Sequence, residues 1–244
     1  GKTERECVKE IVKAVKKAGY VDINDIIDEK KKLKPGSKVY AVWMNKTVAL
    51  FNIGTKDIEK GMNILGAHID SPRMDVKQNP LYEKLFEDGE LAFLDTHYYG
   101  GIKKYQWVTL PLAIHGVVAK KNGDVVDINI GEDKNDPVFC VTDLLIHLAG
   151  NQMEKKASKV IEGEELDILF GSIPLKDTEK EAVKANVLEL IKDKYGMKEE
   201  DFISAELEVV PAGKARDCGI DRSMILAYGQ DDRVCAYTSL VAMI

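Results

Sequence analysis

Two residues suited to metal chemistry stand close together where an apolar stretch of the sequence ends. Residues 66–73 read GAHIDSPR, so His68 and Asp70 close the apolar run that starts at Met62. In an extended chain, residues two apart point to the same side, so the two side chains share a face. The aspartate can then hold one imidazole nitrogen and leave the other for a metal, as at many zinc sites. The same pattern also describes a strand-end histidine hydrogen-bonded to a loop aspartate.

A second acidic pair follows another short apolar strand, in the stretch AYGQDDR that ends at Arg233. A helix is expected after it, and Asp231 or Asp232 could cap that helix, with Arg233 as a surface counter-charge. Alternatively, one carboxylate could bridge two cations above the sheet. Two such strand ends in one chain strengthen the metal-site interpretation of each. These residues alone nevertheless leave both the metal-site and the structural interpretation open.

The first 80 residues contain the elements expected to position His68. Apolar residues at helical spacing predict a helix over 3–18, ended by Gly19. The runs 38–44 and 47–53 predict a hairpin, and the continuous apolar run 62–69 predicts a central strand.

From about residue 80 the sequence is typical of antiparallel sheet. Strand-like pieces of mixed polarity are separated by Gly-Gly, Asn-Gly and Pro, and residues 125–130 alternate between apolar and polar faces. Helices are expected at 142–156 and 178–196, the second opening with a capping box and ending at Gly196. Further strands are expected at 202–210 and 224–229. We therefore expect an α/β fold interrupted by a β-rich module.

Composition limits the kind of protein. The 244 residues are 45% hydrophobic and carry a formal net charge of −6, with no concentrated stripe of lysine and arginine, which argues against nucleic acid as the main partner. No apolar run is long enough to cross a membrane, and the N-terminal stretch is too charged for a signal peptide. The four cysteines lie far apart, without a C-x-x-C motif, so we expect a soluble protein of the reducing cytoplasm.

Three stretches together resemble one enzyme family. GAHIDSPRMDVK, TxYYGGIKKYQW and PAGKARDCGIDRSMILAYGQDDRVCAYTSLVAM are similar to the aspartyl aminopeptidase family of dinuclear zinc aminopeptidases, in the family's order. The resemblance implies a catalytic α/β sheet domain interrupted by an inserted β-rich dimerisation domain. It divides the chain into a first catalytic part at 1–80, the insertion at 81–212, and a second, truncated catalytic part at 213–244. It also implies a homodimer that builds a dodecamer.

The resemblance also implies site residues. His68 would be a ligand of one of two zinc ions, Asp231 would bridge both, and Asp70 would be the active-site acid that orients His68. Asp231 ranks above Asp232 because the family's bridging aspartate is followed by Asn or Asp, and residues 228–230 would shape the approach to the metals. From the inserted domain, His147 or His97 would contact substrate in the partner subunit, although His147 could equally be packed in its helix. His115 is interpreted as structural.

Part of the family's site has no counterpart in this sequence. A Glu-Glu pair, a further acidic ligand and a C-terminal histidine cannot be assigned, and the sequence stops at Ile244 inside an apolar stretch of helical spacing. We therefore expect part of a longer zinc aminopeptidase that hydrolyses N-terminal residues of peptides, with acidic ones implied by the family name. The alternatives are a non-catalytic assembly module and a glutamyl aminopeptidase or carboxypeptidase of the same clan.

Overall fold

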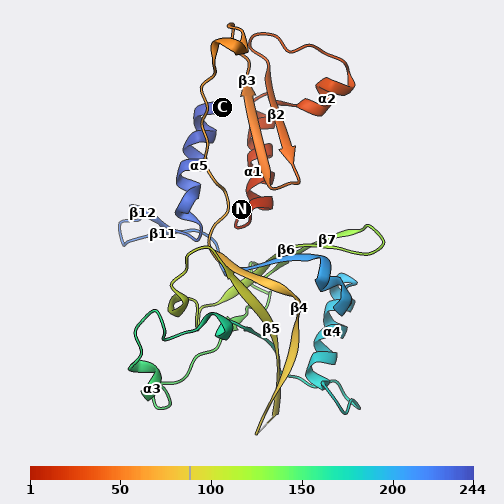
Figure 1. Cartoon of the computed structure of the whole chain (residues 1–244), viewed down its shortest axis with the longest axis vertical. Helices are drawn as coiled ribbons and strands as arrows, with labels where there is room; N and C mark the ends of the chain where they lie inside the picture. The colour runs from red at the N-terminus through yellow and green to blue at the C-terminus, as the bar shows by residue number, and fades with distance from the viewer. Residues whose placement is uncertain (88) are drawn as a thin grey trace. The chain divides into compact units, whose positions relative to one another are not determined.

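The fold consists of two compact units with interleaved sequences. A computed structural model describes residues 1–87 and 89–244 (Figure 1). One unit, here called the terminal unit, comprises Gly1–Ser71 and Gly229–Ile244, and the other, the central unit, comprises Pro72–Tyr228. The fold is a mixed α/β one with a large antiparallel sheet, as expected in outline.

The terminal unit combines a small sheet with two long helices. Its elements are α1 (Glu4–Lys17), β1 (Val21–Asp22), α2 (Ile23–Asp28), β2 (Lys38–Trp43), β3 (Thr47–Asn52), the 3-10 helix η1 (Ile58–Lys60) and α5 (Gln230–Met243). The sheet order is β1-β2-β3, with β1 parallel and β3 antiparallel to β2.

Local signals account for the first elements. The predicted first helix is confirmed as α1, whose N-cap Thr3 accepts a hydrogen bond from the Glu6 amide and which is followed by Gly19 at φ +85°. The predicted hairpin is confirmed as β2 and β3, in register from Lys38 opposite Asn52 to Trp43 opposite Thr47.

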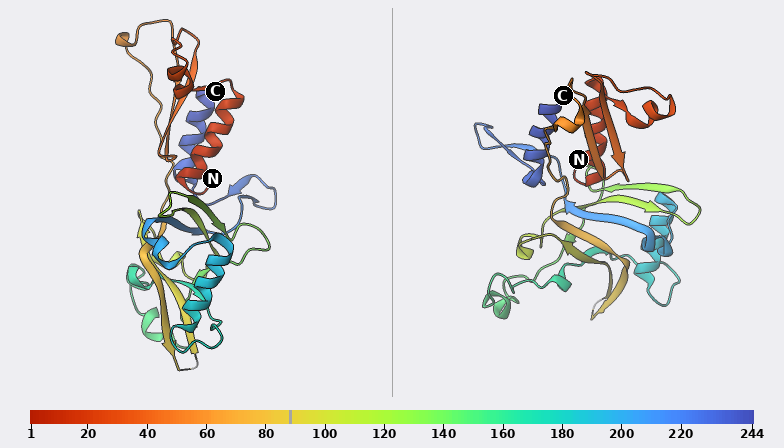
Figure 2. Two further views of the ribbon diagram at one scale, coloured as in Figure 1. Left: turned by 90° about the vertical axis from the view of Figure 1, so that its right-hand side faces the viewer. Right: turned by 45° about the horizontal axis from the view of Figure 1, so that its top comes forward.

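The two long helices lie side by side in the terminal unit (Figure 2). Val15 and Tyr20 are buried together with Tyr40, and Leu240 of α5 packs against this cluster. The Tyr20 hydroxyl contacts Asn52 Oδ1 at 2.7 Å and the Met243 carbonyl oxygen. These contacts hold α5 against α1 and the hairpin.

The strand predicted for residues 62–69 is wrong. The segment has no regular secondary structure, and Met62, Ile64 and Leu65 are exposed. A strand needs a neighbour that takes up its backbone N–H and C=O groups, and the three paired strands of the terminal unit do not include this segment. The apolar pattern of this segment was therefore not sufficient to predict a strand.

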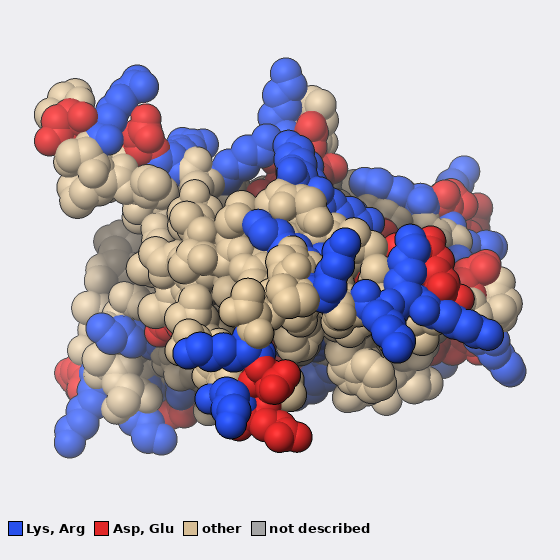
Figure 3. All heavy atoms as spheres, turned by 90° about the horizontal axis from the view of Figure 1, so that it is seen from above, with Lys and Arg blue, Asp and Glu red and all other residues tan. Residues whose placement is uncertain are grey.

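Other apolar side chains of the terminal unit are also exposed, including Trp43 and Met44. The face of the molecule in Figure 3 has a broad area of uncharged side chains, with lysine and arginine side chains around it. Contiguous exposed apolar surface commonly marks an area that another protein segment covers.

The central unit is built on a seven-stranded sheet of order β7-β6-β10-β4-β5-β9-β8, in which every neighbouring pair is antiparallel. Its elements are β4 (Arg73–Phe86), β5 (Gly89–Tyr99), η2 (Lys104–Gln106), β6 (Leu112–Ala119), β7 (Val125–Ile130), β8 (Cys140–Val141), α3 (Gly150–Met153), η3 (Gly163–Glu165), β9 (Ile168–Gly171), α4 (Ala182–Tyr195), η4 (Glu199–Ser204), β10 (Ala205–Pro211), β11 (Arg216–Cys218) and β12 (Met224–Leu226).

Burial in the central unit follows the predicted alternation. Along β7, Val126, Ile128 and Ile130 are at least partly buried and the residues between them are exposed. The core includes Met74, Leu94, Leu112, Ile114 and Ile168, which are almost fully buried. A half-covered antiparallel sheet produces this pattern.

Predictions for the helices of the central unit are only partly confirmed. α4 forms and ends at Gly196 in the left-handed region, but it begins at Ala182 after a Glu181 that makes no side-chain cap, so the predicted capping box is wrong. The helix predicted for 142–156 reduces to α3, because the apolar residues of 144–148 are exposed and pack against no core that would stabilise a helix.

The strands predicted at 202–210 and 224–229 form as the shorter strands β10 and β12. β10 starts at Ala205, after η4, and β12 ends at Leu226. Among the described residues, no helix has the length and apolar character needed to cross a membrane.

Replacing Tyr20 by Phe tests the docking of α5. The variant loses the hydroxyl contacts to Asn52 and Met243, but the Asn52 side-chain amide still donates to the Met243 carbonyl at 2.9 Å. We expect the free energy of unfolding to fall by about 0.5–1 kcal/mol, as for one net hydrogen bond. Urea unfolding of the full-length protein measures it, with exposed Tyr237→Phe as the control. Equal midpoints for the two variants would contradict the role of Tyr20.

Candidate metal centre

Three carboxylates of the terminal unit lie around the imidazole of His68. His68 and Asp70 lie on the irregular segment after η1, and Asp231 and Asp232 lie at the start of α5. His68 Nδ1 is 3.1 Å from Asp70 Oδ1 and 3.1 Å from the Asp70 carbonyl oxygen. His68 Nε2 is 3.4 Å from Asp231 Oδ1 and 3.8 Å from Asp232 Oδ2. The two ring nitrogens therefore face different acidic groups.

The hydrogen-bond partners of Nδ1 determine which nitrogen of the His68 ring carries the proton in the neutral imidazole. Because a carboxylate and a carbonyl can only accept, Nδ1 is the donor to Asp70. The lone pair of the neutral ring is then on Nε2, which faces the pair Asp231 and Asp232. This is the orientation in which an imidazole can bind a metal through Nε2. The expected pairing of His68 with Asp70 is present, although the segment is not a strand.

The electrostatic surroundings favour positive charge at His68. Desolvation acts to lower its pKa, but the hydrogen bonds to Asp70 and the negative charges of Asp70 and Asp232 together raise the pKa of His68 above its ordinary value. A group of acids that favours a proton on an imidazole also favours a cation beside it. The site can therefore attract a metal ion.

The two aspartates at the start of α5 have different environments. Asp232 Oδ1 accepts a hydrogen bond from the Cys235 amide at 3.3 Å, and its side chain is only 20% exposed. The Asp231 side chain is 89% exposed. Both residues have non-helical backbone angles, and the peptide bond between them is cis. The capping role therefore belongs to Asp232, while Asp231 presents its carboxylate to Nε2 and to solvent.

The other three histidines of the sequence lie in the central unit. His97 lies on β5, is exposed and stacks on Tyr98 with ring centroids 5.4 Å apart. His147 is exposed in an irregular segment, so its interpretation as a packed helical histidine is wrong. His115 is 2% exposed and its Nε2 lies 3.0 Å from Glu132 Oε1, in agreement with a structural role.

The donor set around His68 is suited to zinc but is incomplete. Imidazole nitrogen and carboxylate oxygen are both zinc ligands, and His68 and Asp231 present one of each. Among the described residues, however, no three or more His, Cys, Asp and Glu side chains gather closely enough to hold a metal ion. A zinc centre here would need further ligands besides these two.

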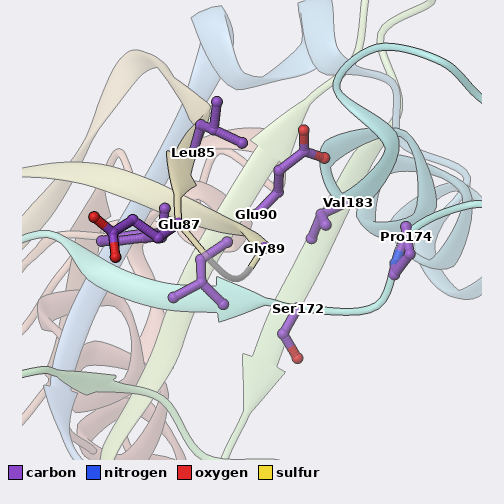
Figure 4. Close-up of a pocket in the computed structure, with 9 residues that line it drawn as sticks. Leu85, Glu87, Gly89, Glu90, Ser172, Pro174 and Val183 are labelled. Carbon is purple, nitrogen blue, oxygen red and sulfur yellow. The ribbon is translucent and has the colours of Figure 1, made fainter.

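The central unit has a hollow of about 660 Å³ at the end of β4 and β5 (Figure 4). Its walls come from these two strands, the segment after β9, and Val183 of α4. Its described lining includes the carboxylates Glu87 and Glu90 but no histidine or cysteine. It offers no nitrogen or sulfur ligand for zinc, so the group around His68 is the better candidate.

Sequence reasoning missed two residues next to the candidate centre. Arg233, interpreted as a surface counter-charge, is half-buried, and its guanidinium donates to Ser71 Oγ at 2.8 Å. Ser71 in turn donates to the Asp231 carbonyl oxygen at 2.8 Å. In the sequence, their position was the one indication of a role. Arg233 directly follows the pair Asp231 and Asp232, and Ser71 directly follows Asp70.

Comparisons with known proteins identify relatives along the whole chain. The family model described as "Aminopeptidase I zinc metalloprotease (M18)" matches residues 1–244. The Clostridium acetobutylicum protein named "Probable M18 family aminopeptidase 1" is 63% identical over 244 residues, which are 100% of this chain and 52% of that protein.

Two solved structures also match nearly the whole chain. The crystal structure of an M18-family aminopeptidase from Thermotoga maritima matches with a TM-score of 0.90 at 48% identity, covering 99% of this chain and 51% of that one. The S. cerevisiae mApe1 dodecamer matches in fold, with a TM-score of 0.66 at 19% identity, over 99% of this chain and 52% of that one. The chain spans about half the length of the curated relatives it matches.

Alanine substitutions can separate the two aspartates. Asp232→Ala removes the side chain that caps α5, so we expect the free energy of unfolding to fall by about 1 kcal/mol. Asp231→Ala should change it by less than about 0.5 kcal/mol, because the side chain is exposed. Urea unfolding of the two full-length variants, both stripped of metal, makes the comparison without any contribution from bound zinc. A larger loss for Asp231→Ala would contradict the assigned roles.

Proposed function

Since this chain belongs to the M18 family of aminopeptidase I zinc metalloproteases, we propose that it supplies His68 and Asp231 to the two-zinc centre of an aminopeptidase. The reaction is hydrolysis of the first peptide bond of a peptide with a free N-terminus. The observation that carries the proposal is the 3.4 Å approach of His68 Nε2 to Asp231 Oδ1, from two distant segments of the chain.

Each residue of the centre has a distinct task. His68 would hold one zinc through Nε2, and Asp70 holds the opposite ring nitrogen so that the ring keeps this orientation. Asp231 would bridge the two ions with its exposed carboxylate, while Asp232 keeps the start of α5 in place. Bound zinc would supply a Lewis acid for the scissile carbonyl and lower the pKa of a water molecule toward neutrality.

The rest of the organisation is proposed on the family resemblance. The central unit lies in sequence between the two parts of the terminal unit, which supports a catalytic domain interrupted by an insertion at about 81–212. We propose that this insertion forms a homodimer interface and that the dimers build a dodecamer. His97 or His147 would then contact substrate in the partner subunit. Four free cysteines support a cytoplasmic protein.

Zinc content and activity of the full-length protein test the proposal. The wild type should bind about two zinc ions per chain, and His68→Ala should lose at least one of them and all peptide hydrolysis while keeping its oligomeric state. Asp217→Asn, a change at an exposed carboxylate of β11, is the control and should behave as wild type. Normal activity of His68→Ala at saturating zinc would contradict the assignment. A wild type that binds no zinc when titrated would favour the non-catalytic assembly module.

The substrate class can be tested separately. The family resemblance implies acidic N-terminal residues, so Asp- and Glu-terminal chromogenic substrates should be cleaved with a higher kcat/KM than the Lys-terminal one. The three substrates are compared on the full-length enzyme with zinc added. A preference for the Lys-terminal substrate would exclude acidic specificity. It would not contradict the proposed metal centre.

A further inference from the structure

A single arginine ties together the segments that carry the metal centre. The Arg233 guanidinium donates through Nη1 to Ser71 Oγ at 2.8 Å and to the Gly229 carbonyl at 3.1 Å. Its Nη2 donates to the Lys2 carbonyl at 2.8 Å, and its Nε lies 2.9 Å from Cys7 Sγ. Arg233 therefore connects α5 with the start of the chain, with α1 and with the segment that follows His68.

Ser71 passes this connection on to Asp231. The Ser71 side chain is nearly inaccessible, with the residue 3% exposed. Its one hydroxyl proton goes to the Asp231 carbonyl oxygen at 2.8 Å, and its oxygen accepts from Arg233. Ser71 directly follows Asp70, which holds the His68 ring. One hydroxyl group thus joins two segments that are 160 residues apart in sequence.

The turn before Asp231 is shaped around the guanidinium. Gly229 has φ +81°, and a Cβ atom there would lie 1.8 Å from Arg233 Nη1 and 3.3 Å from Ser71 Oγ. Only glycine leaves room for this approach at this backbone angle. The close contact between Arg233 and this turn therefore requires glycine at position 229.

The bonding of Arg233 leaves the negative charge of the centre in place. Within the part of the chain that the structure describes, its guanidinium contacts two carbonyl oxygens, a hydroxyl and a thiol, and no carboxylate. A planar guanidinium can serve several acceptors in fixed directions, which a lysine ammonium cannot. Arg233 can thus fix the backbone without forming an ion pair with Asp231.

We propose that Arg233 and Ser71 act in series as positioning residues that set the separation of Asp231 and His68 and thereby the zinc affinity of the centre. The inference rests on the proposed function, because the ligand whose affinity they set is the zinc held by His68 and Asp231. Neither residue is one of the proposed zinc ligands.

Zinc affinity of the full-length protein tests this proposal. The protein is stripped of metal, and its zinc Kd is measured by competition with a chromogenic chelator. Ser71→Ala should weaken zinc binding by about 10–100-fold, the usual effect of removing a group that supports a ligand. Arg233→Gln should weaken it to a similar degree. The controls are Ser239→Ala, later in the same helix, and Arg222→Gln, an exposed arginine, and both should retain the wild-type Kd.

The double variant distinguishes a relay from two independent structural effects. If Arg233 acts through Ser71, the combined Ser71→Ala and Arg233→Gln variant should lose no more affinity than the more damaging single change. Full additivity of the two losses would overturn the relay, and so would a zinc-binding wild type with an unchanged Ser71→Ala Kd. A wild type that binds no zinc would overturn both the proposed function and this inference. Because Ser71→Ala removes one oxygen atom, it keeps the test valid even if Arg233→Gln does not fold.

Discussion

The candidate centre depends on the return of α5 to the first part of the chain. Leu240 packs against the cluster of Val15, Tyr20 and Tyr40, and the Tyr20 hydroxyl reaches the last turn of the helix at Met243. These contacts fix the C-terminal end of α5, and the bonds of Arg233 fix its beginning. Asp231 faces His68 because both ends of the helix are held.

The structure explains which parts of the fold the sequence could predict. α1, the β2–β3 hairpin and the end of α4 at Gly196 follow from caps, turns and short-range periodicity, which act within a few residues. The segments 62–69 and 142–149 carry apolar patterns but form no strand or helix, because such elements need partners distant in sequence. These two predictions are wrong because the segments lack the tertiary contacts that would stabilise a strand or a helix. The apolar pattern itself is present in the sequence.

The same distinction applies to the centre. The pairing of His68 with Asp70 is local, and the spacing of two residues was enough to predict it. The choice between Asp231 and Asp232 depends on which carboxylate the α5 backbone uses as a cap, and the sequence alone left this open. The role of Arg233 was missed because its partners Ser71, Cys7 and Lys2 are all distant in sequence. The two ligands proposed here are part of the set that a two-zinc centre needs, in a chain about half as long as its relatives.

Anomalous diffraction at the zinc edge from crystals of the zinc-loaded full-length protein tests the central claim most directly. The account predicts an anomalous peak about 2.0–2.1 Å from His68 Nε2 and a carboxylate oxygen of Asp231 at about 2.0–2.2 Å from the same ion. Asp232 should remain bonded to the Cys235 amide. Zinc bound elsewhere in the protein, or held through Asp232 while Asp231 stays in solvent, would contradict it.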